Sequence, residues 1–213
     1  MSSSTSLEMK QDLEQELEAE DGVVDLMRLV DRLSFPWVAL PAGPRRWAPT
    51  DLSVEVEGSV VQLARLTYRT VGDRAVVVAG AVPSVDSDAL ADRLATPLLF
   101  AYHQRRRGGG SAAVMMAAVR GELIWEDVAS GDWRVGTVGA GDRPVRLLQR
   151  TGADGHLVIA AHGVALEEIS AMADGLVPLV PGDDVVSDLH ARHRRGLAQR
   201  WWDAPRAPWT PED

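Results

Sequence analysis

The chain has 213 residues, no cysteine and a formal net charge of −9 at pH 7. This length allows one large domain or two small ones with a proper core. The lack of cysteine excludes disulfides, thiolate catalysis and cysteine-ligated metal sites. The N-terminus is polar and acidic, and the longest apolar run, residues 112–119, is far shorter than the roughly 20 residues that a membrane span needs. We therefore expect a cytoplasmic protein with no membrane segment.

The negative charge is concentrated at the N-terminus. Residues 1–21 hold seven carboxylates against one lysine, which gives −6 and leaves −3 for the rest of the chain. Residues 22–213 are therefore close to neutral and have no general electrostatic attraction for nucleic acid. Nucleic acid is not an expected partner. Lys10 is the only lysine among 22 basic residues, a usage typical of bacteria with GC-rich genomes.

Residues 1–21 are expected to form an acidic arm, and two forms of it remain open. Met9, Leu13 and Leu17 are spaced by four, so a helix here would carry one narrow apolar stripe. Such a helix is marginal in water without a partner. The arm is therefore either a flexible tail or a helix that docks on a partner through Leu13 and Leu17.

Residues 22–110 are expected to form a first α+β half. Helical spacing of apolar residues predicts a helix over 22–33 that is capped by Asp21. Four prolines predict irregular structure over 36–50. Alternating or continuous apolar residues predict three strands, at 52–57, 60–69 and 75–82.

A helix should follow these strands, with Ser87 or Asp88 as its cap, and Pro97 should kink or split it. The next segment, 105–110, is expected to be a loop. There Arg105, Arg106 and Arg107 precede three glycines, a composition that could hold phosphate or another anion. Neither a Walker pattern nor a dinucleotide-binding glycine pattern is present. The favoured interpretation is a mobile connection between two halves of the chain.

Residues 111–181 are expected to form a second α+β half. Residues 112–119 could be either a strand or a short buried helix, since alanine and methionine also favour the helical state. The patterns that follow predict four strands and one helix, at 122–128, 133–138, 144–150, 157–161 and 166–176.

The two halves resemble each other in sequence. Residues 65–73 match residues 146–154, which lie 81 positions later, and the match continues without a gap from 76–79 to 157–160. Such a trace is typical of an internal duplication. We therefore predict an α+β fold with a mostly antiparallel sheet, packed helices and two pseudo-symmetric strand–strand–helix halves.

The C-terminal part is predicted to be a helix over 182–203, followed by an irregular tail over 204–213. Apolar residues and one histidine, spaced by three or four, are expected to form the packed edge of this helix: Val186, Leu189, His193, Leu197 and Trp201. His190 and His193 lie on neighbouring turns of this helix and could ligate a metal together with a carboxylate. The arginines around them oppose a divalent cation, so neither a metal nor another cofactor is expected.

The seven tryptophans fall into two groups. Four are expected to pack in the core: Trp37, Trp47, Trp125 and Trp133. The other three, Trp201, Trp202 and Trp209, lie in or after the terminal helix. Neighbours on a helix point about 100° apart, so Trp201 and Trp202 cannot both face one core. Because tryptophan and arginine are enriched at interface hot spots, this segment is a candidate partner-binding surface.

No catalytic motif is present, so the leading hypothesis is a non-enzymatic protein-binding module such as an adaptor, a chaperone or an assembly subunit. Its partner would be another protein or a second copy of the chain. The alternative is a small-ligand or anion-binding sensor, or an enzyme, with a pocket between the two halves. A deep cleft that gathers His103, His156 or His162 with charged residues would favour this alternative.

Overall fold

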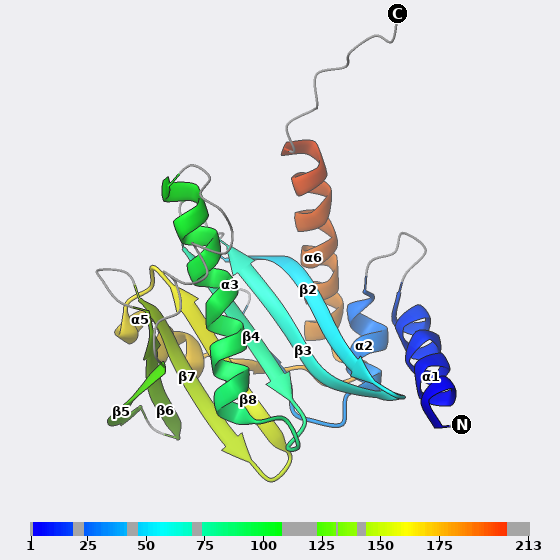
Figure 1. Ribbon diagram of the computed structural model, residues 1–213. Coiled ribbons are helices and arrows are strands. Elements are labelled where there is room, and N and C mark those ends of the chain that lie inside the picture. The colour runs from blue at the N-terminus through cyan, green and yellow to red at the C-terminus, as the bar shows by residue number, and fades with distance from the viewer. Residues whose placement is uncertain are drawn as a thin grey trace, which may run out of the picture.

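A computed structural model describes residues 2–18, 24–41, 47–69, 74–107, 123–130, 132–139 and 144–203 of the chain. A seven-stranded antiparallel sheet with the order β2-β3-β4-β8-β7-β6-β5 forms the centre of the molecule (Figure 1). Its strands are β2 (Ala48–Glu57), β3 (Val60–Arg69), β4 (Ala75–Ala81), β5 (Leu123–Ser130), β6 (Trp133–Val138), β7 (Val145–Gly152) and β8 (Gly155–His162). The predicted α+β class is confirmed.

Five helices and a short two-stranded sheet complete the described part. The helices are α1 (Ser2–Leu17), α2 (Leu26–Arg32), α3 (Ser87–Arg107), α5 (Leu166–Asp174) and α6 (Asp184–Asp203). The short sheet pairs β1 (Val38–Ala39) with β9 (Val177–Pro178). The predicted strands are therefore present, and β2 starts four residues before the predicted strand, inside the segment expected to be irregular.

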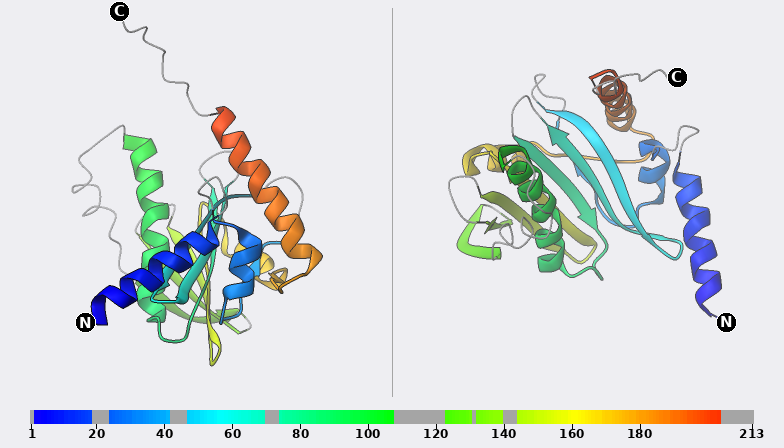
Figure 2. Two further views of the ribbon diagram at one scale, coloured as in Figure 1. Left: turned by 90° about the vertical axis from the view of Figure 1, so that its right-hand side faces the viewer. Right: turned by 45° about the horizontal axis from the view of Figure 1, so that its top comes forward.

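The sheet has a hydrophobic layer on each face, which explains the nearly continuous apolar sequences of β4 and β8. One layer contains residues of α1, α2, α5, α6 and β1, whereas α3 supplies the helical part of the other. Figure 2 shows α3 and α6 on opposite sides of the sheet. On the α3 face, β2 and β3 carry polar residues such as Ser53 and Arg65, so α3 lies across the apolar β7 and β8 instead.

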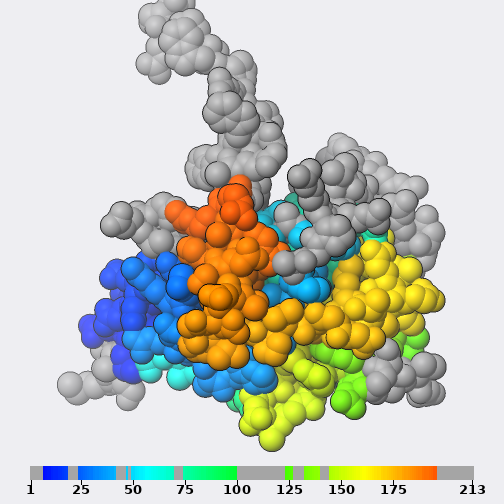
Figure 3. All heavy atoms as spheres, turned by 180° about the vertical axis from the view of Figure 1, so that it is seen from behind, coloured from blue at the N-terminus to red at the C-terminus, as the bar shows by residue number. Residues whose placement is uncertain are grey.

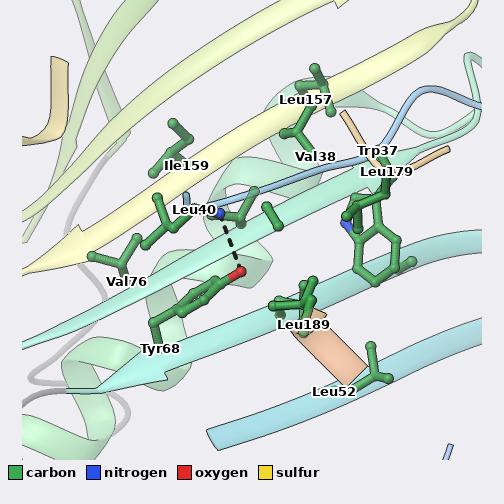
Figure 4. Packing of buried hydrophobic residues seen from close by; sticks show 14 of the residues in the cluster. Trp37, Val38, Leu40, Leu52, Tyr68, Val76, Leu157, Ile159, Leu179 and Leu189 are labelled. Carbon is green, nitrogen blue, oxygen red and sulfur yellow. Dashed lines mark hydrogen bonds between the residues drawn. The ribbon is translucent and has the colours of Figure 1, made fainter. Parts of the chain in front are cut away.

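The segment from Phe35 to Leu40 crosses the other face directly over β4. Gly80 of β4 makes this approach possible, because a Cβ atom there would lie 2.9 Å from the Pro36 carbonyl oxygen and 3.0 Å from ring atoms of Phe35 and Trp37. The Leu40 N–H donates to the Tyr68 hydroxyl oxygen at 3.3 Å, within a buried cluster that includes Leu189 of α6 (Figure 4).

The predicted gapless duplication is not confirmed. β4 and β8 are antiparallel neighbours, and Val78 lies opposite Ile159, its counterpart 81 positions later. The preceding strands differ, however, because Leu66 pairs with Val78 whereas Leu148, and not Leu147, pairs with Ile159. A slip of one residue moves side chains to the other face. Leu66 and its counterpart Leu147 accordingly belong to different hydrophobic layers.

The helices of the two halves also differ. α3 and α5 both contact β7 and β8, but they pack in different layers and so cover opposite faces of the sheet. They also differ in length, with 21 and 9 residues. A twofold axis normal to the sheet would place equivalent helices on one face. The strand–strand–helix units are therefore not equivalent in their packing.

Several predicted helix boundaries are wrong. α2 begins at Leu26 and is capped by Asp25, whose carboxylate accepts from two backbone N–H groups. The carboxylate of Asp86, and neither Ser87 nor Asp88, accepts from backbone N–H groups at the start of α3. Pro97 does not split this helix.

α3 continues through Arg105, Arg106 and Arg107, where a loop was predicted. Four leucines of α3 pack against the sheet, and this burial offsets the backbone hydrogen bond that Pro97 removes. The alternatives for residues 112–119, the cap at Asp21 and the tail over 204–213 lie outside the described residues.

Candidate functional site

The C-terminal helix α6 starts after a tight turn. Gly182 adopts φ +78°, a backbone conformation that favours glycine. The Asp183 carboxylate accepts from the Val185 N–H at 3.3 Å, and Asp184 adds negative charge in the first turn. The sequence around the turn therefore fixes where α6 begins.

The first half of α6 is anchored by one buried stripe. Val186, Leu189 and His193 are 2%, 0% and 1% exposed, and the helix packs on β2 and α2. Figure 3 shows α6, in orange, lying against α2, in blue, on this side of the molecule. The spacing of three and four residues predicted this apolar edge, and the structure confirms it for these three positions.

Polar groups surround the anchored stripe. His190 Nδ1 lies 3.9 Å from the Asp25 carboxylate that caps α2, and Arg192 Nε lies 2.9 Å from Asp188 Oδ2. Burial raises the pKa of the Tyr68 phenol above its ordinary range, against the hydrogen bond from Leu40 and the charge of Arg192, which both lower it. The apolar base of α6 therefore also has polar groups beside it, of which His190 lies next to a group of another helix.

The second half of α6 extends beyond these anchors. The helix has 20 residues, and about 15 Å of it follows His193 at a rise of about 1.5 Å per residue. In Figure 1 this end of α6 rises past the ends of the neighbouring strands. Positions 201 and 202 belong to this end, while Trp209 and the side chains of Trp201 and Trp202 lie outside the described part of the structure.

Leu13 and Leu17, the other two predicted partner-binding residues, are covered by this chain itself. They are 7% and 1% exposed, because α1 packs on β2 and α2. Arg32 pairs with Glu16, and the Arg28 guanidinium donates to the carbonyl oxygens of Glu16 and Glu18. Residues 2–17 of the arm therefore form a docked helix rather than a flexible tail, and Leu13 and Leu17 do not offer a free surface, whereas Met9 of the same stripe is 42% exposed.

The candidate anion site is not tested by the structure. Arg105, Arg106 and Arg107 lie in the last turn of α3, and their side chains are outside the described residues, as are the three glycines that follow. A helical backbone at these arginines differs from the predicted loop. The role of the arginines stays a prediction.

His156 and His162 do not meet in one cleft, and the side chain of His103 lies outside the described part of the structure. His156 and His162 lie at opposite ends of β8, roughly 20 Å apart at about 3.3 Å per residue. His156 is buried, with its ring nitrogens 3.3 Å from the Thr151 hydroxyl and 3.3 Å from the Pro83 carbonyl oxygen. Within the described ranges, no three histidine or carboxylate side chains are placed to hold a metal ion.

A pocket of about 330 Å³ lies at a different place from the one predicted. It is formed by the β2–β3 hairpin, the β4–α3 connection and α3, so its walls come from the first half of the sequence and not from both halves. An ion pair between Arg93 and Glu55 lies at this pocket, whose lining contains no histidine.

The four tryptophans expected in the core are packed there. Trp37 and Trp133 are buried, and Trp47 and Trp125 pack against the two layers. Sequence reasoning missed three arginine–ring contacts: Arg74 with Trp47 at 5.4 Å, Arg134 with Trp125 at 4.0 Å and Arg150 with Trp133 at 4.9 Å. These contacts use tryptophan and arginine for packing within the chain itself.

Comparisons with protein-family models, with characterised protein sequences and with solved structures found no match to this chain. No helix in the described ranges combines the length and the apolar character that crossing a membrane requires.

Proposed function

We propose that the protein is a non-enzymatic protein-binding module, an adaptor, chaperone or assembly subunit, and that it binds its partner through the C-terminal end of α6. The observation that carries this proposal is the division of α6 into an anchored half and an extended half. Val186, Leu189 and His193 hold the first half on the body. The extended half carries Trp201 and Trp202 together with arginines, which are residue types common at interface hot spots.

The internal roles of the other described tryptophans support this proposal. Trp37, Trp47, Trp125 and Trp133 all contribute to the folded body. The adjacent pair at 201 and 202 belongs to the end of α6 that lies beyond the anchored stripe. A cytoplasmic adaptor with a projecting helix could present this pair to another protein or to a second copy.

The alternative, a small-ligand sensor or an enzyme with a pocket between the halves, has less support. His156 and His162 are separated along β8, and His193 is buried where α6 packs on the rest of the protein. The lining of the described pocket includes Ser84 but no histidine, and its Arg93 pairs with Glu55. We therefore favour binding over catalysis.

The proposal is tested by purifying tagged wild-type protein and the double variant Trp201→Ala/Trp202→Ala from the native host, followed by mass spectrometry. Proteins lost with the double variant are then produced, and their binding is measured directly by calorimetry. Ile124→Ala is the matched control, because Ile124 is 60% exposed and lies on β5 at an edge of the sheet. We expect binding by wild type and Ile124→Ala only. Equal binding by a correctly folded double variant would refute the proposal.

A further inference from the structure

The short helix α2 lies between two longer helices. Figure 1 shows it between α1 and α6, and both of these helices contact it. α2 has only seven residues, which is too few for a helix to be stable by itself in water. The three helices contribute to one buried cluster, which contains Leu17, Leu26, Leu29 and Leu189. The order of α2 therefore depends on its neighbours, which include α1 and α6.

The residue that caps α2 also connects its neighbours. The Asp25 N–H donates to the Leu17 carbonyl oxygen of α1 at 2.7 Å. Oδ1 of Asp25 accepts from two backbone N–H groups of α2 and lies 3.9 Å from His190 Nδ1 of α6. Asp25 thus bonds to α1 through its backbone, caps α2 and lies beside α6 through its side chain. A displacement of Asp25 at α1 is therefore transmitted to the cap of α2 and to its neighbour on α6.

A second residue of α2 holds the end of α1. The Arg28 guanidinium donates to the carbonyl oxygens of Glu16 and Glu18 at 3.1 Å each. Carbonyl groups at a helix C-terminus lack partners within the helix, and a cation there also complements the helix dipole. Asp25 and Arg28 therefore hold the C-terminal end of α1 on the first turn of α2.

The rest of α1 is attached by few buried side chains. Among its described side chains, Leu13 and Leu17 belong to the buried cluster, whereas Leu7 and Met9 are 60% and 42% exposed. Figure 2 shows α1 at the outside of the molecule, beyond α2. Elements with few buried apolar contacts open locally without unfolding of the whole protein. α1 is therefore able to detach while the sheet stays folded.

We propose that α1 is a regulatory strap, an element whose docking controls the order of α2 and thereby the orientation of α6. When α1 is docked, α2 is helical and holds the base of α6 in one orientation. When α1 detaches, Asp25 loses its bond to Leu17 and α2 loses a neighbour. α6 then keeps its packing on β2 but becomes more mobile at its base.

This proposal rests on the proposed function where it concerns a partner, because it adds the control of the helix that carries Trp201 and Trp202. A preordered α6 loses less conformational entropy on binding, so the state with α1 docked is the state that binds. Coupling between two sites is reciprocal, and a partner bound to α6 therefore also keeps α1 docked.

Two measurements on the full chain report the order of α6. The first is hydrogen exchange followed by mass spectrometry over residues 188–193. The second is the distance between nitroxide labels on Arg195→Cys and Ile124→Cys, measured by pulsed electron spin resonance. Both of these residues are exposed, and the natural chain has no cysteine that would take up a label.

Two variants weaken the docking of α1, and each has a matched control. Leu17→Ala removes a buried contact, and Leu7→Ala makes the same change at an exposed position of α1. Arg28→Ala removes the two bonds to the end of α1 but leaves the buried cluster intact, so it tests the proposal even if Leu17→Ala does not fold. Arg93→Ala removes an arginine with an exposed ion pair on α3.

We expect Leu17→Ala to raise hydrogen exchange over residues 188–193 by about fivefold or more and to broaden the distribution of label distances. Arg28→Ala should have the same effects, with a rise in exchange of about twofold. Leu7→Ala and Arg93→Ala should change neither measurement, and β4 and β8 should stay protected in all four variants.

Unchanged exchange and an unchanged distance distribution in both docking variants would overturn the proposal, because α6 would then be independent of α1. A rise in β4 and β8 equal to that in α6 would also overturn it, since α6 would then become mobile only when the whole protein unfolds. If the coupling is absent while the double variant of Trp201 and Trp202 still loses its native partner, only this proposal fails. If the coupling is present while the double variant binds normally, the proposed function fails and the coupling stands.

Discussion

Replacing Tyr68 with phenylalanine should change how the stability of the protein depends on alkaline pH. Tyr68 is fully buried, and burial raises the pKa of its phenol above the ordinary value. In the unfolded chain the phenol ionises near pH 10, whereas in the folded chain it stays neutral. The stabilising contribution of the neutral phenol is therefore complete below pH 10 and is lost as the pH rises above it, because only the unfolded state gains the charge.

The size of the effect follows from this linkage. One group that ionises only in the unfolded state lowers the free energy of unfolding by about 0.4 kcal/mol at pH 10 and about 1.4 kcal/mol at pH 11. Tyr68→Phe removes this loss. It also removes the acceptor of the buried Leu40 N–H, which should cost about 1–3 kcal/mol at pH 8.

Urea unfolding of both proteins at pH 8, 9, 10 and 11 measures these quantities. The difference between wild type and Tyr68→Phe isolates Tyr68 from every other group that titrates in this range. We expect the variant to be less stable at pH 8 and the difference to shrink by about 1.4 kcal/mol at pH 11. A constant difference over the whole range would refute the reasoning, since it would mean that the phenol ionises equally in both states.

Two further substitutions test the packing. Gly80→Ala should lower the free energy of unfolding by about 1–3 kcal/mol in urea titrations, because its Cβ would meet the Pro36 carbonyl oxygen at 2.9 Å. Gly152→Ala, with the nearest atom at 3.8 Å, should change it little, and equal effects would contradict this account. Leu17→Ala should increase hydrogen exchange of the α1 amides while β4 and β8 stay protected, whereas Leu7→Ala, at a site 60% exposed, should not. Exchange that rises equally throughout the protein would show that α1 does not detach separately.

The secondary structure was largely predictable from the sequence, whereas the residues at which the helices begin were not. Alternation in β2 and the apolar run in β4 reflect burial on one or two faces, so they are local signals. The N-cap residues of helices are harder to predict, because several neighbouring aspartates and serines can act as the cap. Asp25 and Asp86 cap α2 and α3, whereas the sequence led us to predict Asp21 for the first helix and Ser87 or Asp88 for the other.

The pairing of the strands could not be predicted. Similar sequences in β3 and β7 suggested equivalent roles, but a one-residue difference in register places Leu66 and Leu147 in different layers. The arginine–tryptophan contacts depend on register in the same way. Trp125 covers Gly136 because these residues are opposite each other on β5 and β6, which no local pattern reveals.

The candidate binding surface on α6 was also predictable only in part. Spacing in the sequence identified the apolar edge of α6, and it showed that Trp201 and Trp202 cannot share one side. It did not show how positions 201 and 202 lie relative to the packed side of α6, because this depends on which part of the edge is buried. The burial of Val186, Leu189 and His193 fixes the rotation of the helix, and it places position 202 about half a turn and position 201 about a quarter of a turn from His193.

A polar contact near the start of α6 helps to explain why this helix has the rotation about its axis that the structure shows. An apolar stripe alone tolerates small rotations of a helix, since apolar contacts have little directional preference. Polar groups at partly buried positions are more restrictive, because each needs a partner at a defined distance and direction. His190 Nδ1, which lies 3.9 Å from the Asp25 carboxylate that caps α2, is such a polar group at the base of α6. Together with the buried side chains of Val186, Leu189 and His193, it fixes the rotation of the first half of the helix, and a continuous helix carries that rotation to its C-terminal end.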